Sequence, residues 1–476
     1  MSDVSNKTEL KWYEGISSYQ WMVLLIASLG WVFDVFEGQI FVASMRDAMP
    51  ALLNVAPEDA SVSSWNNIAF GFFLFGGAVG GVLFGILSDR IGRSKTMIIT
   101  ILFYSLFTCA SSFSQAPWQM VALRFLVAMG VGGEWAVAAA MVAEVMPTRS
   151  RSVMGSIFHA SSVFGTLLAA ATVATLIGNE SINAWFLDRG WEAWRVGFAI
   201  GVLPALLTLL IRWKLREPDS WKAAKEQAAQ DPNQKMGQLS ELFSSENLRA
   251  TIVGVSLSTV GLVTFWGIHI YGKNALLRRA QADALVAAEL IPPGEQATAE
   301  EKTTYDVQKK AVLNGPAAAT IKRAEMMSMV LNTIGGGLGL VLFGWISDRI
   351  GRKGAFVLYH VAAFAVVILL FQILLPSNAS ATALAVCLPV FGFFTLGMHA
   401  GYAVYFPELY PTRVRGTGTG FCFNFGRLGT GIAFVSFGIL YKMTPESQAL
   451  LLAPLYLLGA VIVLFGRETR GVELQQ

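Results

Sequence analysis

Five ionisable residues lie inside long apolar stretches of the chain, where a charge is expensive. Asp34 and Glu37 are three residues apart in the first such stretch, a spacing that places both carboxylates on one face of a helix. Arg124 and Glu134 lie in the fourth stretch, and Arg427 lies near the middle of the eleventh. Because ionisable side chains are rare and costly within a membrane, each of the five is a candidate for proton or substrate binding.

The composition predicts that most of the chain lies in a membrane. Of the 476 residues, 54% are hydrophobic and only 14% are charged, and the mean hydropathy is +0.53. An average soluble domain has about 25% charged residues. A formal net charge of +3 also leaves no basic surface of the kind that binds nucleic acid.

Twelve stretches are long and apolar enough to span a bilayer, which takes about 20 residues. We expect these helices at residues 19–44, 64–87, 96–114, 117–143, 151–177, 194–213, 250–271, 325–346, 354–375, 382–405, 416–440 and 447–466. An even number of spans places both termini on one side. Lys and Arg are concentrated in the loops of that side, so we expect the termini and the 214–248 linker to be cytoplasmic.

Residues 273–323 form an insertion between the seventh and eighth stretches, on the outer side by parity. The insertion contains eight Lys and Arg residues, but long loops are translocated largely regardless of charge. Its composition suggests one or two solvated helices broken at Pro292–Pro293. It is either a surface insertion without direct function or an external lid or partner surface. The three cysteines have no spacing typical of disulfides or metal sites, and we expect no metal and no cofactor.

Two sequence motifs each occur twice, in the same order and at nearly the same offset. The first spans residues 85–93 and recurs at 344–352, and the second spans 144–151 and recurs at 408–415. The repetition indicates a duplicated six-helix unit. We therefore expect an N-terminal bundle at 1–213, a linker at 214–248 and a C-terminal bundle at 249–476.

The residue types of both motifs suit a clasp between helix ends. Glycine permits a tight turn and a close backbone approach, and the aspartates and glutamates can pair with arginines of the same or neighbouring loops. Such pairs can break and re-form as two halves of a transporter rock. Alternatively, the arginines only anchor the topology by their charge. The expected clasp residues are Gly85, Asp89, Arg90, Gly92, Arg93, Glu144, Arg149, Arg151, Gly344, Asp348, Arg349, Gly351, Arg352, Glu408, Arg413 and Arg415.

The doubled motifs resemble those of the major facilitator superfamily, over nearly all of the chain except the insertion. The second motif is similar to that of the sugar porters and the organic-acid/proton symporters. Residues 33–37 resemble the Asp-Gly-Phe-Asp signature of aromatic-acid/proton symporters, with Val35 in place of Gly and Glu37 in place of the second Asp. Residues 124–135 resemble the sialate and lactate porters. The resemblance implies an all-α membrane protein of two pseudo-symmetric six-helix bundles.

The resemblance also implies roles for the buried charges, because helices one, four and eleven line the central cavity of that fold. Arg124 would pair with either Asp34 or Glu37, and release of Arg124 to a substrate would let Asp34 take up a proton. The pair could instead be purely structural. Arg427 would hold a carboxylate of the substrate or pair with Glu37 or Glu134. Glu134 is a second titrating group or a buried packing residue.

Four further residues are candidates for substrate contacts. They are Gln39, His159, His399 and Asn424. The two histidines belong to cavity-lining helices of the resembled fold. For each lone histidine, a satisfied structural role is the alternative interpretation.

The expected function is secondary active transport of a small organic solute across the plasma membrane, the inner membrane of a bacterium, by alternating access. Proton symport of an organic anion by a monomer is favoured, and a sugar or polyol porter is the alternative. A solute sensor that does not transport is a third possibility, but such sensors usually have a larger cytoplasmic region than this linker. The sequence contains no nucleotide-binding loop or nucleophile motif, so no enzymatic activity is expected.

Overall fold

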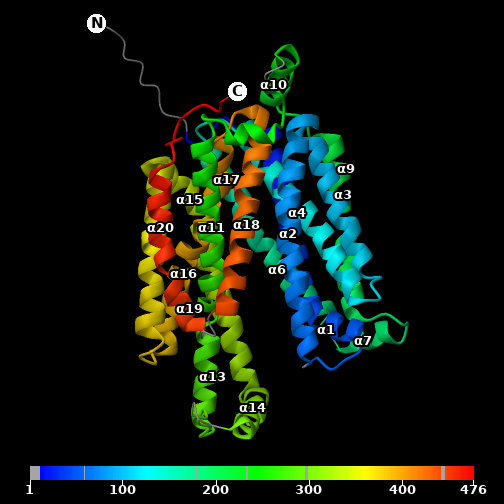
Figure 1. Ribbon diagram of the computed structural model, residues 1–476, viewed down its shortest axis with the longest axis vertical. Coiled ribbons are helices and arrows are strands. Elements are labelled where there is room, and N and C mark those ends of the chain that lie inside the picture. Colours follow the sequence, from blue (N-terminus) through cyan, green and yellow to red (C-terminus); the bar gives the residue numbers. More distant parts are fainter. Residues whose placement is uncertain are drawn as a thin grey trace.

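The chain forms a bundle of long helices that stand side by side (Figure 1). The computed structural model describes residues 11–57, 59–177, 180–231, 234–294, 298–440 and 445–475, and these ranges contain no strand. Helix α10 (Asp219–Gln230) and the C-terminus lie at one end of the bundle, which we call the linker end. Helices α13 (Ala275–Ala287) and α14 (Ala299–Asn314) extend from the opposite end, which we call the hairpin end.

Two groups of helices make up the bundle. The N-terminal group comprises α1 (Ser18–Leu53), α2 (Ala60–Ile91), α3 (Arg93–Ser111), α4 (Pro117–Val145), α5 (Arg151–Ala160), α6 (Ser162–Thr172), α7 (Glu180–Leu187), α8 (Ala193–Ala199) and α9 (Ala205–Lys214). The C-terminal group comprises α11 (Leu248–Thr264), α12 (Ile270–Gly272), α13, α14, α15 (Ala318–Ile368), α16 (Ala381–Gly397), α17 (Ala400–Glu408), α18 (Arg415–Leu440), α19 (Pro445–Leu452) and α20 (Pro454–Leu464). Short 3-10 or π-helical turns join them at residues 173–177, 200–202, 239–243, 265–269, 369–374 and 412–414.

The helices coincide with the predicted spans. Ten helical stretches of the described residues are long and apolar enough to cross a membrane. One of them, Ala318–Leu374, contains both predicted spans 325–346 and 354–375, which are separated by a kink at Gly351, where the backbone leaves helical geometry. Helix α18 occupies the predicted span 416–440 without being one of the ten.

Glycine stripes allow the helices of the N-terminal group to pack closely. A Cβ atom added to Gly76 would lie 2.2 Å from the carbonyl oxygen of Phe125, and one added to Gly80 would lie 2.0 Å from that of Met129. Both glycines therefore let α2 approach the backbone of α4. This small-residue packing is typical of membrane helices, which gain little from hydrophobic burial against one another.

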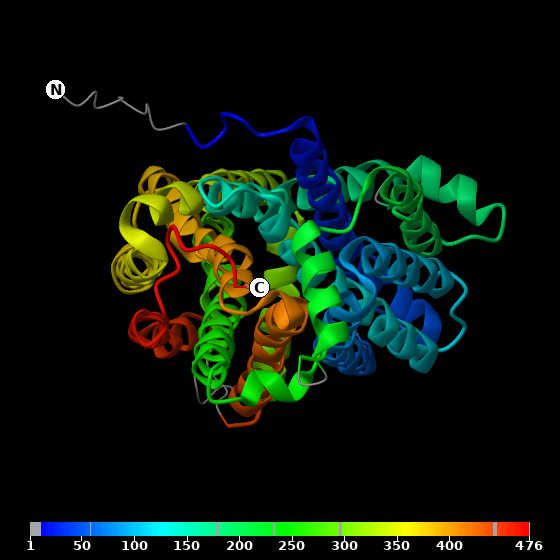
Figure 2. The ribbon, with the colours of Figure 1, turned by 90° about the horizontal axis from the view of Figure 1, so that it is seen from above.

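The two groups meet along a seam, here defined as the contacts of α2 with α18 and of α5 with α15 and α17. Figure 1 shows α2 and α18 running side by side at the linker end, and Figure 2 shows the two groups on either side of them. The seam positions side chains of the N-terminal group directly against those of the C-terminal group.

The insertion at 273–323 contains two helices, as its composition suggested. Helices α13 and α14 are joined through a non-helical stretch that includes Pro292–Pro293. Helix α13 is anchored by Arg278, which forms an ion pair with Glu446, and by Arg279, whose Nη1 donates to the Asn378 carbonyl at 2.7 Å. A role as a lid or a partner surface stays a prediction.

Candidate transport site and clasp

The N-terminal copies of the two motifs form the centre of the clasp. Arg93 Nη1 lies 2.7 Å from Asp89 Oδ1, and Arg93 Nη2 lies 2.7 Å from Glu144 Oε1. Arg415, on the other side of the seam, places Nη1 2.9 Å from the same Glu144 oxygen. All four side chains are fully buried. The cost of burying these charges is offset only while both signs stay in contact, so the network favours a closed seam.

Asp89 has a second role that the motif alone did not predict. Its carboxylate accepts from Gly416 N at 3.0 Å, from Thr417 N at 2.8 Å and from Thr417 Oγ1 at 2.6 Å. Those two residues form the first turn of α18, whose backbone N–H groups favour a negative charge. A residue of the N-terminal group therefore caps a helix of the C-terminal group.

The C-terminal copies build a similar cluster with weaker contacts across the seam. Arg352 pairs with Asp348 at 2.9 Å and with Glu408 at 3.0 Å. Across the seam, Ser152 Oγ donates to Asp348, and Arg151 Nη1 lies 4.0 Å from Glu408 Oε1. The clasp is thus asymmetric although its motifs are duplicated.

The four glycines of the first motif have two different roles. Gly92 and Gly351 adopt φ angles of 112° and 84°, a left-handed region that favours glycine, where the chain turns into the next helix. Gly85 and Gly344 lie at the seam. A Cβ atom on either would approach a backbone oxygen of the other group, to 2.7 Å and 2.4 Å respectively.

Four of the predicted clasp arginines make no ion pair across the seam within the described residues: Arg90, Arg149, Arg349 and Arg413. They contact other segments or, for Arg349, the Trp345 ring of the same helix. Arg413, for example, pairs with Glu241 of the linker at 2.6 Å. For these four, a role in the cytoplasmic gate stays a prediction.

Two glutamates that the motif analysis missed complete the clasp. Glu217 accepts from the backbone N–H of Arg93 at 2.6 Å, and Glu468 accepts from that of Arg352 at 2.9 Å. Each carboxylate therefore caps the helix that starts after a motif glycine. Burial raises the pKa of Glu468, but four backbone hydrogen bonds outweigh it, so that this pKa lies below its ordinary value. The shared Arg-Glu dipeptides at 216–217 and 467–468 are the sequence signal that could have identified the pair.

Glu37, rather than Asp34, is the partner of Arg124. Arg124 Nη1 and Glu37 Oε1 form a buried ion pair, and Arg124 Nη2 donates to Ser111 Oγ at 2.6 Å. Thr108 Oγ1 also donates to Glu37 Oε1, at 3.2 Å. The sequence left open whether Asp34 or Glu37 pairs with Arg124. In the structure Glu37 does, because side chains of α3 and α4 both reach its carboxylate.

Asp34 is buried without a hydrogen-bond partner among the described residues. Its side chain is 2% exposed, and neither carboxylate oxygen is paired. Glu134 of α4, Tyr104 of α3 and Arg427 of α18 are its electrostatic neighbours. Glu134 Oε2 accepts from Thr100 Oγ1 at 2.7 Å, and its Oε1 has no described partner. Two incompletely paired acids thus share one site at the centre of the N-terminal group.

Arg427 reaches across the seam without forming an ion pair within the described residues. Its guanidinium lies over the Phe423 ring at 5.2 Å from the centroid, and Gly77 of α2 leaves room for it. The alternative pairing with Glu37 or Glu134 is not observed. Asn424 lies about one helical turn before Arg427 on α18. Its Nδ2 donates to the Gly132 carbonyl at 3.1 Å. Asn424 therefore joins the two groups, and only its Oδ1 lacks a described partner.

The two candidate histidines differ in how their rings are satisfied. His159 Nδ1 accepts from Trp135 Nε1 at 3.2 Å, which fits the structural interpretation. His399 Nδ1 contacts the Leu396 carbonyl at 3.1 Å, and its buried Nε2 has no described partner. Gln39 is exposed on α1, so a role for it in substrate binding stays a prediction.

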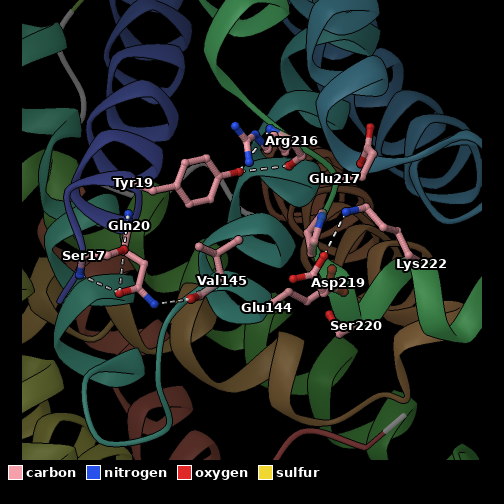
Figure 3. Close-up of a pocket in the computed structure, with 11 residues that line it drawn as sticks. Ser17, Tyr19, Gln20, Glu144, Val145, Arg216, Glu217, Asp219, Ser220 and Lys222 are labelled. Atoms are coloured by element: carbon pink, nitrogen blue, oxygen red, sulfur yellow. Dashed lines mark hydrogen bonds and ion pairs between the residues drawn. The ribbon is translucent and has the colours of Figure 1, made fainter. Parts of the chain in front are cut away.

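A cavity of about 370 Å³ at the linker end does not belong to the seam. Figure 3 shows it between the start of α1, the end of α4 and the start of α10, with Gln20 Nε2 donating to the Val145 carbonyl at 2.9 Å. Its lining residues are Ser17, Tyr19, Gln20, Glu144, Val145, Arg216, Glu217, Pro218, Asp219, Ser220 and Lys222. All of them come from the N-terminal group or the linker, and one of them, Glu144, also belongs to the clasp.

Family models account for most of the chain. The sugar (and other) transporter model matches residues 21–266, and the major facilitator superfamily model matches residues 318–475. The chain belongs to the sugar (and other) transporter family, within the major facilitator superfamily. It is therefore a multi-pass membrane transporter and not an enzyme.

Curated relatives of this transporter align over nearly the whole chain. A probable 4-methylmuconolactone transporter of Cupriavidus pinatubonensis is 29% identical over 98% of this chain and 94% of its own. A cis,cis-muconate transport protein of Acinetobacter baylyi is 26% identical over 89% of each chain. The sialic acid transporter NanX of Escherichia coli is 25% identical over 88% of this chain and 86% of its own.

Solved structures confirm the fold. The proton:xylose symporter XylE bound to 6-bromo-6-deoxy-D-glucose superposes with a TM-score of 0.70 at 18% identity, over 96% of this transporter and 98% of XylE. The E. coli fucose:proton symporter FucP superposes with a TM-score of 0.58 at 14% identity, over 94% and 99% of the two chains. At these identities the likeness shows the major facilitator fold alone.

Proposed function

We propose that this transporter is a proton-coupled symporter of a small organic anion that carries a carboxylate. The observation that carries the proposal is Arg427, a cation at the seam without an ion-pair partner among the described residues. A planar guanidinium suits bidentate binding of a carboxylate. The relatives named for 4-methylmuconolactone, muconate and sialic acid support an organic anion as cargo.

The proton site would be the acid pair Asp34 and Glu134, with Arg124 and Glu37 as a fixed ion pair beside it. An ionised carboxylate buried without an ion pair in direct contact is costly, and protonation removes that cost. Arg427 is close enough to Asp34 to act on its charge. A substrate carboxylate bound to Arg427 would weaken that influence, so that anion binding and proton uptake by Asp34 would favour each other.

The proposal includes an orientation and a division of the chain. The linker end would face the cytoplasm of a bacterium, with the chain in the inner membrane, because Lys and Arg are concentrated there. Residues 1–213 and 249–476 would move as two units joined by the 214–248 linker. The clasp would then be the cytoplasmic gate, and one chain would be sufficient for transport.

The test is uptake by the purified transporter in liposomes with an imposed inside-alkaline pH gradient. Radiolabelled monocarboxylates, unsaturated dicarboxylates, sialic acid and several sugars are compared. Accumulation of an acid that collapses with a protonophore supports the proposal. Sugar uptake that is indifferent to the gradient would contradict it and favour the sugar porter, the second candidate suggested by the family model.

Replacement of Asp34 by Asn tests the coupling step directly. We expect Asp34→Asn to abolish accumulation driven by the pH gradient while substrate exchange between equal compartments continues. Asn keeps the size of the side chain but cannot release a proton. Unchanged accumulation by Asp34→Asn would remove Asp34 from the coupling mechanism.

A further inference from the structure

The chain beyond α20 turns back over the clasp. Residues 472–475, here called the strap, lie on the surface of the linker end, and their polar atoms contact both sides of the seam. On the C-terminal side, the carbonyl oxygen of Gln475 accepts from Thr412 N at 3.1 Å, from Thr412 Oγ1 at 3.0 Å and from Arg415 Nη2 at 2.8 Å. Three donors thus converge on one backbone oxygen.

The strap also binds the loop between α4 and α5, on the N-terminal side of the seam. Thr148 Oγ1 donates to Glu473 Oε1 at 2.8 Å, and Arg151 Nη1 donates to the Val472 carbonyl at 3.3 Å. The strap leaves from α20, a helix of the C-terminal group. It therefore connects the C-terminal group to the N-terminal group by hydrogen bonds that add to the buried ion pairs.

The strap completes the hydrogen bonding of the arginine that closes the clasp. Arg415 is fully buried, and its Nε donates to the Pro407 carbonyl at 2.9 Å. Its Nη1 donates to Glu144 and to Thr412. Among the described residues, Nη2 has one acceptor, the carbonyl of Gln475. Without the strap, a buried donor of Arg415 would be unsatisfied, which is costly.

We infer that the strap is a working part of the clasp, because it positions Arg415 against Glu144 and favours the state in which the linker end of the seam is closed. When the two groups separate at this end, Thr148 and Arg151 move away from Thr412 and Arg415. The strap can then keep one set of contacts but not both. A contact made in only one of two states shifts the equilibrium toward that state.

The corresponding segment after α9 has no such role. It begins similarly, with Glu217 capping α3, but it then enters α10, where Trp221 Nε1 donates to the Asp89 carbonyl at 2.7 Å. Both of these contacts stay on the N-terminal side of the seam. Farther along, the linker reaches the C-terminal group through Gly237 and Glu241, which both contact Arg413, so what distinguishes the strap is its contact with Arg415. The inference goes beyond the proposed function, because it concerns the conformational equilibrium and not the cargo.

The experiment measures the separation of the two groups at the linker end without substrate. Spin labels are placed on cysteines at Lys95 and Lys353, in a background with Cys109→Ala, and distances are measured by double electron–electron resonance. Deletion of residues 472–476 should raise the ratio of separated to closed molecules by about fivefold to thirtyfold. This is the change expected when one or two hydrogen bonds that favour the closed state are lost. Glu473→Ala should raise it by a smaller factor in the same direction.

Three further variants keep the result interpretable. Thr148→Val removes the partner of Glu473 and also an acceptor of Arg151 Nη2, so it should raise the ratio at least as much as Glu473→Ala, whereas Thr148→Ser should restore the original ratio. Glu226→Ala, an exposed acid on α10 outside the clasp, should change nothing. The inference is overturned if Glu473→Ala and Thr148→Val leave the ratio unchanged while Asp89→Asn shifts it, even where the deletion prevents folding. Failure of the proposed function would be seen in liposome uptake instead.

Discussion

At the scale of single residues, the interior of this transporter contains charges that are balanced and charges that are not. Arg124 and Glu37 balance each other's charge in a buried pair that Ser111 and Thr108 extend, although Glu37 Oε2 and Arg124 Nε have no described hydrogen-bond partner. Asp34 and Arg427 are left without a hydrogen bond within the described residues. Balanced charges stabilise the helix packing, whereas unbalanced ones are available to a proton or a ligand.

Removing one member of the balanced pair should destabilise the protein. Glu37→Gln leaves Arg124 buried without its counter-charge, which typically costs about 3–5 kcal/mol. The measurement is the thermal unfolding midpoint in detergent. The double variant Glu37→Gln/Arg124→Gln is the control and should recover part of the loss. If Glu37→Gln melts like the wild type, the pair contributes nothing to stability.

Removing the unbalanced cation should affect substrate binding rather than folding. Arg427→Gln deletes the charge proposed to hold the carboxylate, and we expect the KM for an organic anion to rise by about tenfold or more, equivalent to about 1.4 kcal/mol or more. The unfolding midpoint should stay near that of the wild type. An unchanged KM, with a lowered midpoint, would make Arg427 a structural residue.

At the scale of the helices, α2 is the element on which the arrangement depends. It presents Gly76 and Gly80 to α4, and Gly77 and Gly81 to α18. Because these glycines have no side chains, α2 can approach both α4 and α18 closely. The clasp and the surroundings of Arg427 therefore both contact one element.

A single added methyl group on α2 should be costly where the neighbour is backbone. In Gly80→Ala the new Cβ would lie 2.0 Å from the carbonyl oxygen of Met129, which cannot move without displacing α4. We expect a loss of about 1–3 kcal/mol in stability. Gly71→Ala is the matched control on the same helix, because no atom lies within 4 Å of its Cβ. Equal unfolding midpoints for the two variants would show that α2 and α4 are not in close contact.

At the scale of the whole molecule, the closed seam at the linker end depends on asymmetric contacts between two similar groups. Asp89 is fully buried and caps α18, whereas the equivalent Asp348 is partly exposed and contacts only the Ser152 side chain across the seam. Duplicated motifs therefore contribute unequally to one conformational equilibrium. Because both groups need only separate at one end, a change in a few contacts can shift that equilibrium.

The asymmetry predicts different effects for the two aspartates. Asp89→Asn loses a charged cap and an ion pair, and we expect the seam to open in a larger fraction of molecules. Hydrogen bonds to charged groups contribute about 1.5–3 kcal/mol each. Asp348→Asn should have a smaller effect. Alkylation rates of a cysteine introduced at Ser156, which is buried beside Gly344, measure the opening. Equal rates in the two variants would contradict the asymmetry.

Much of this molecule was predictable from the sequence, for physical reasons that act locally. Apolar stretches of about 20 residues require helices because a bilayer leaves no other partner for backbone groups. The duplicated motifs predicted where helix ends cluster, and Arg93, Arg352, Glu144 and Glu408 lie in the ion-pair clusters that were expected there. The positions of buried charges were equally readable from the sequence, because they interrupt apolar stretches.

Tertiary structure decided which of these groups touch. The spacing of Asp34 and Glu37 placed both on one face, but only the packing of α1 against α3 and α4 assigns Glu37 to Arg124. Likewise, nothing local distinguishes Asp89 from Asp348, or indicates that a carbonyl of the strap reaches Arg415. Partners up to 328 residues apart are chosen by how helices cross, and directional hydrogen bonds then select among side chains that the sequence makes equivalent.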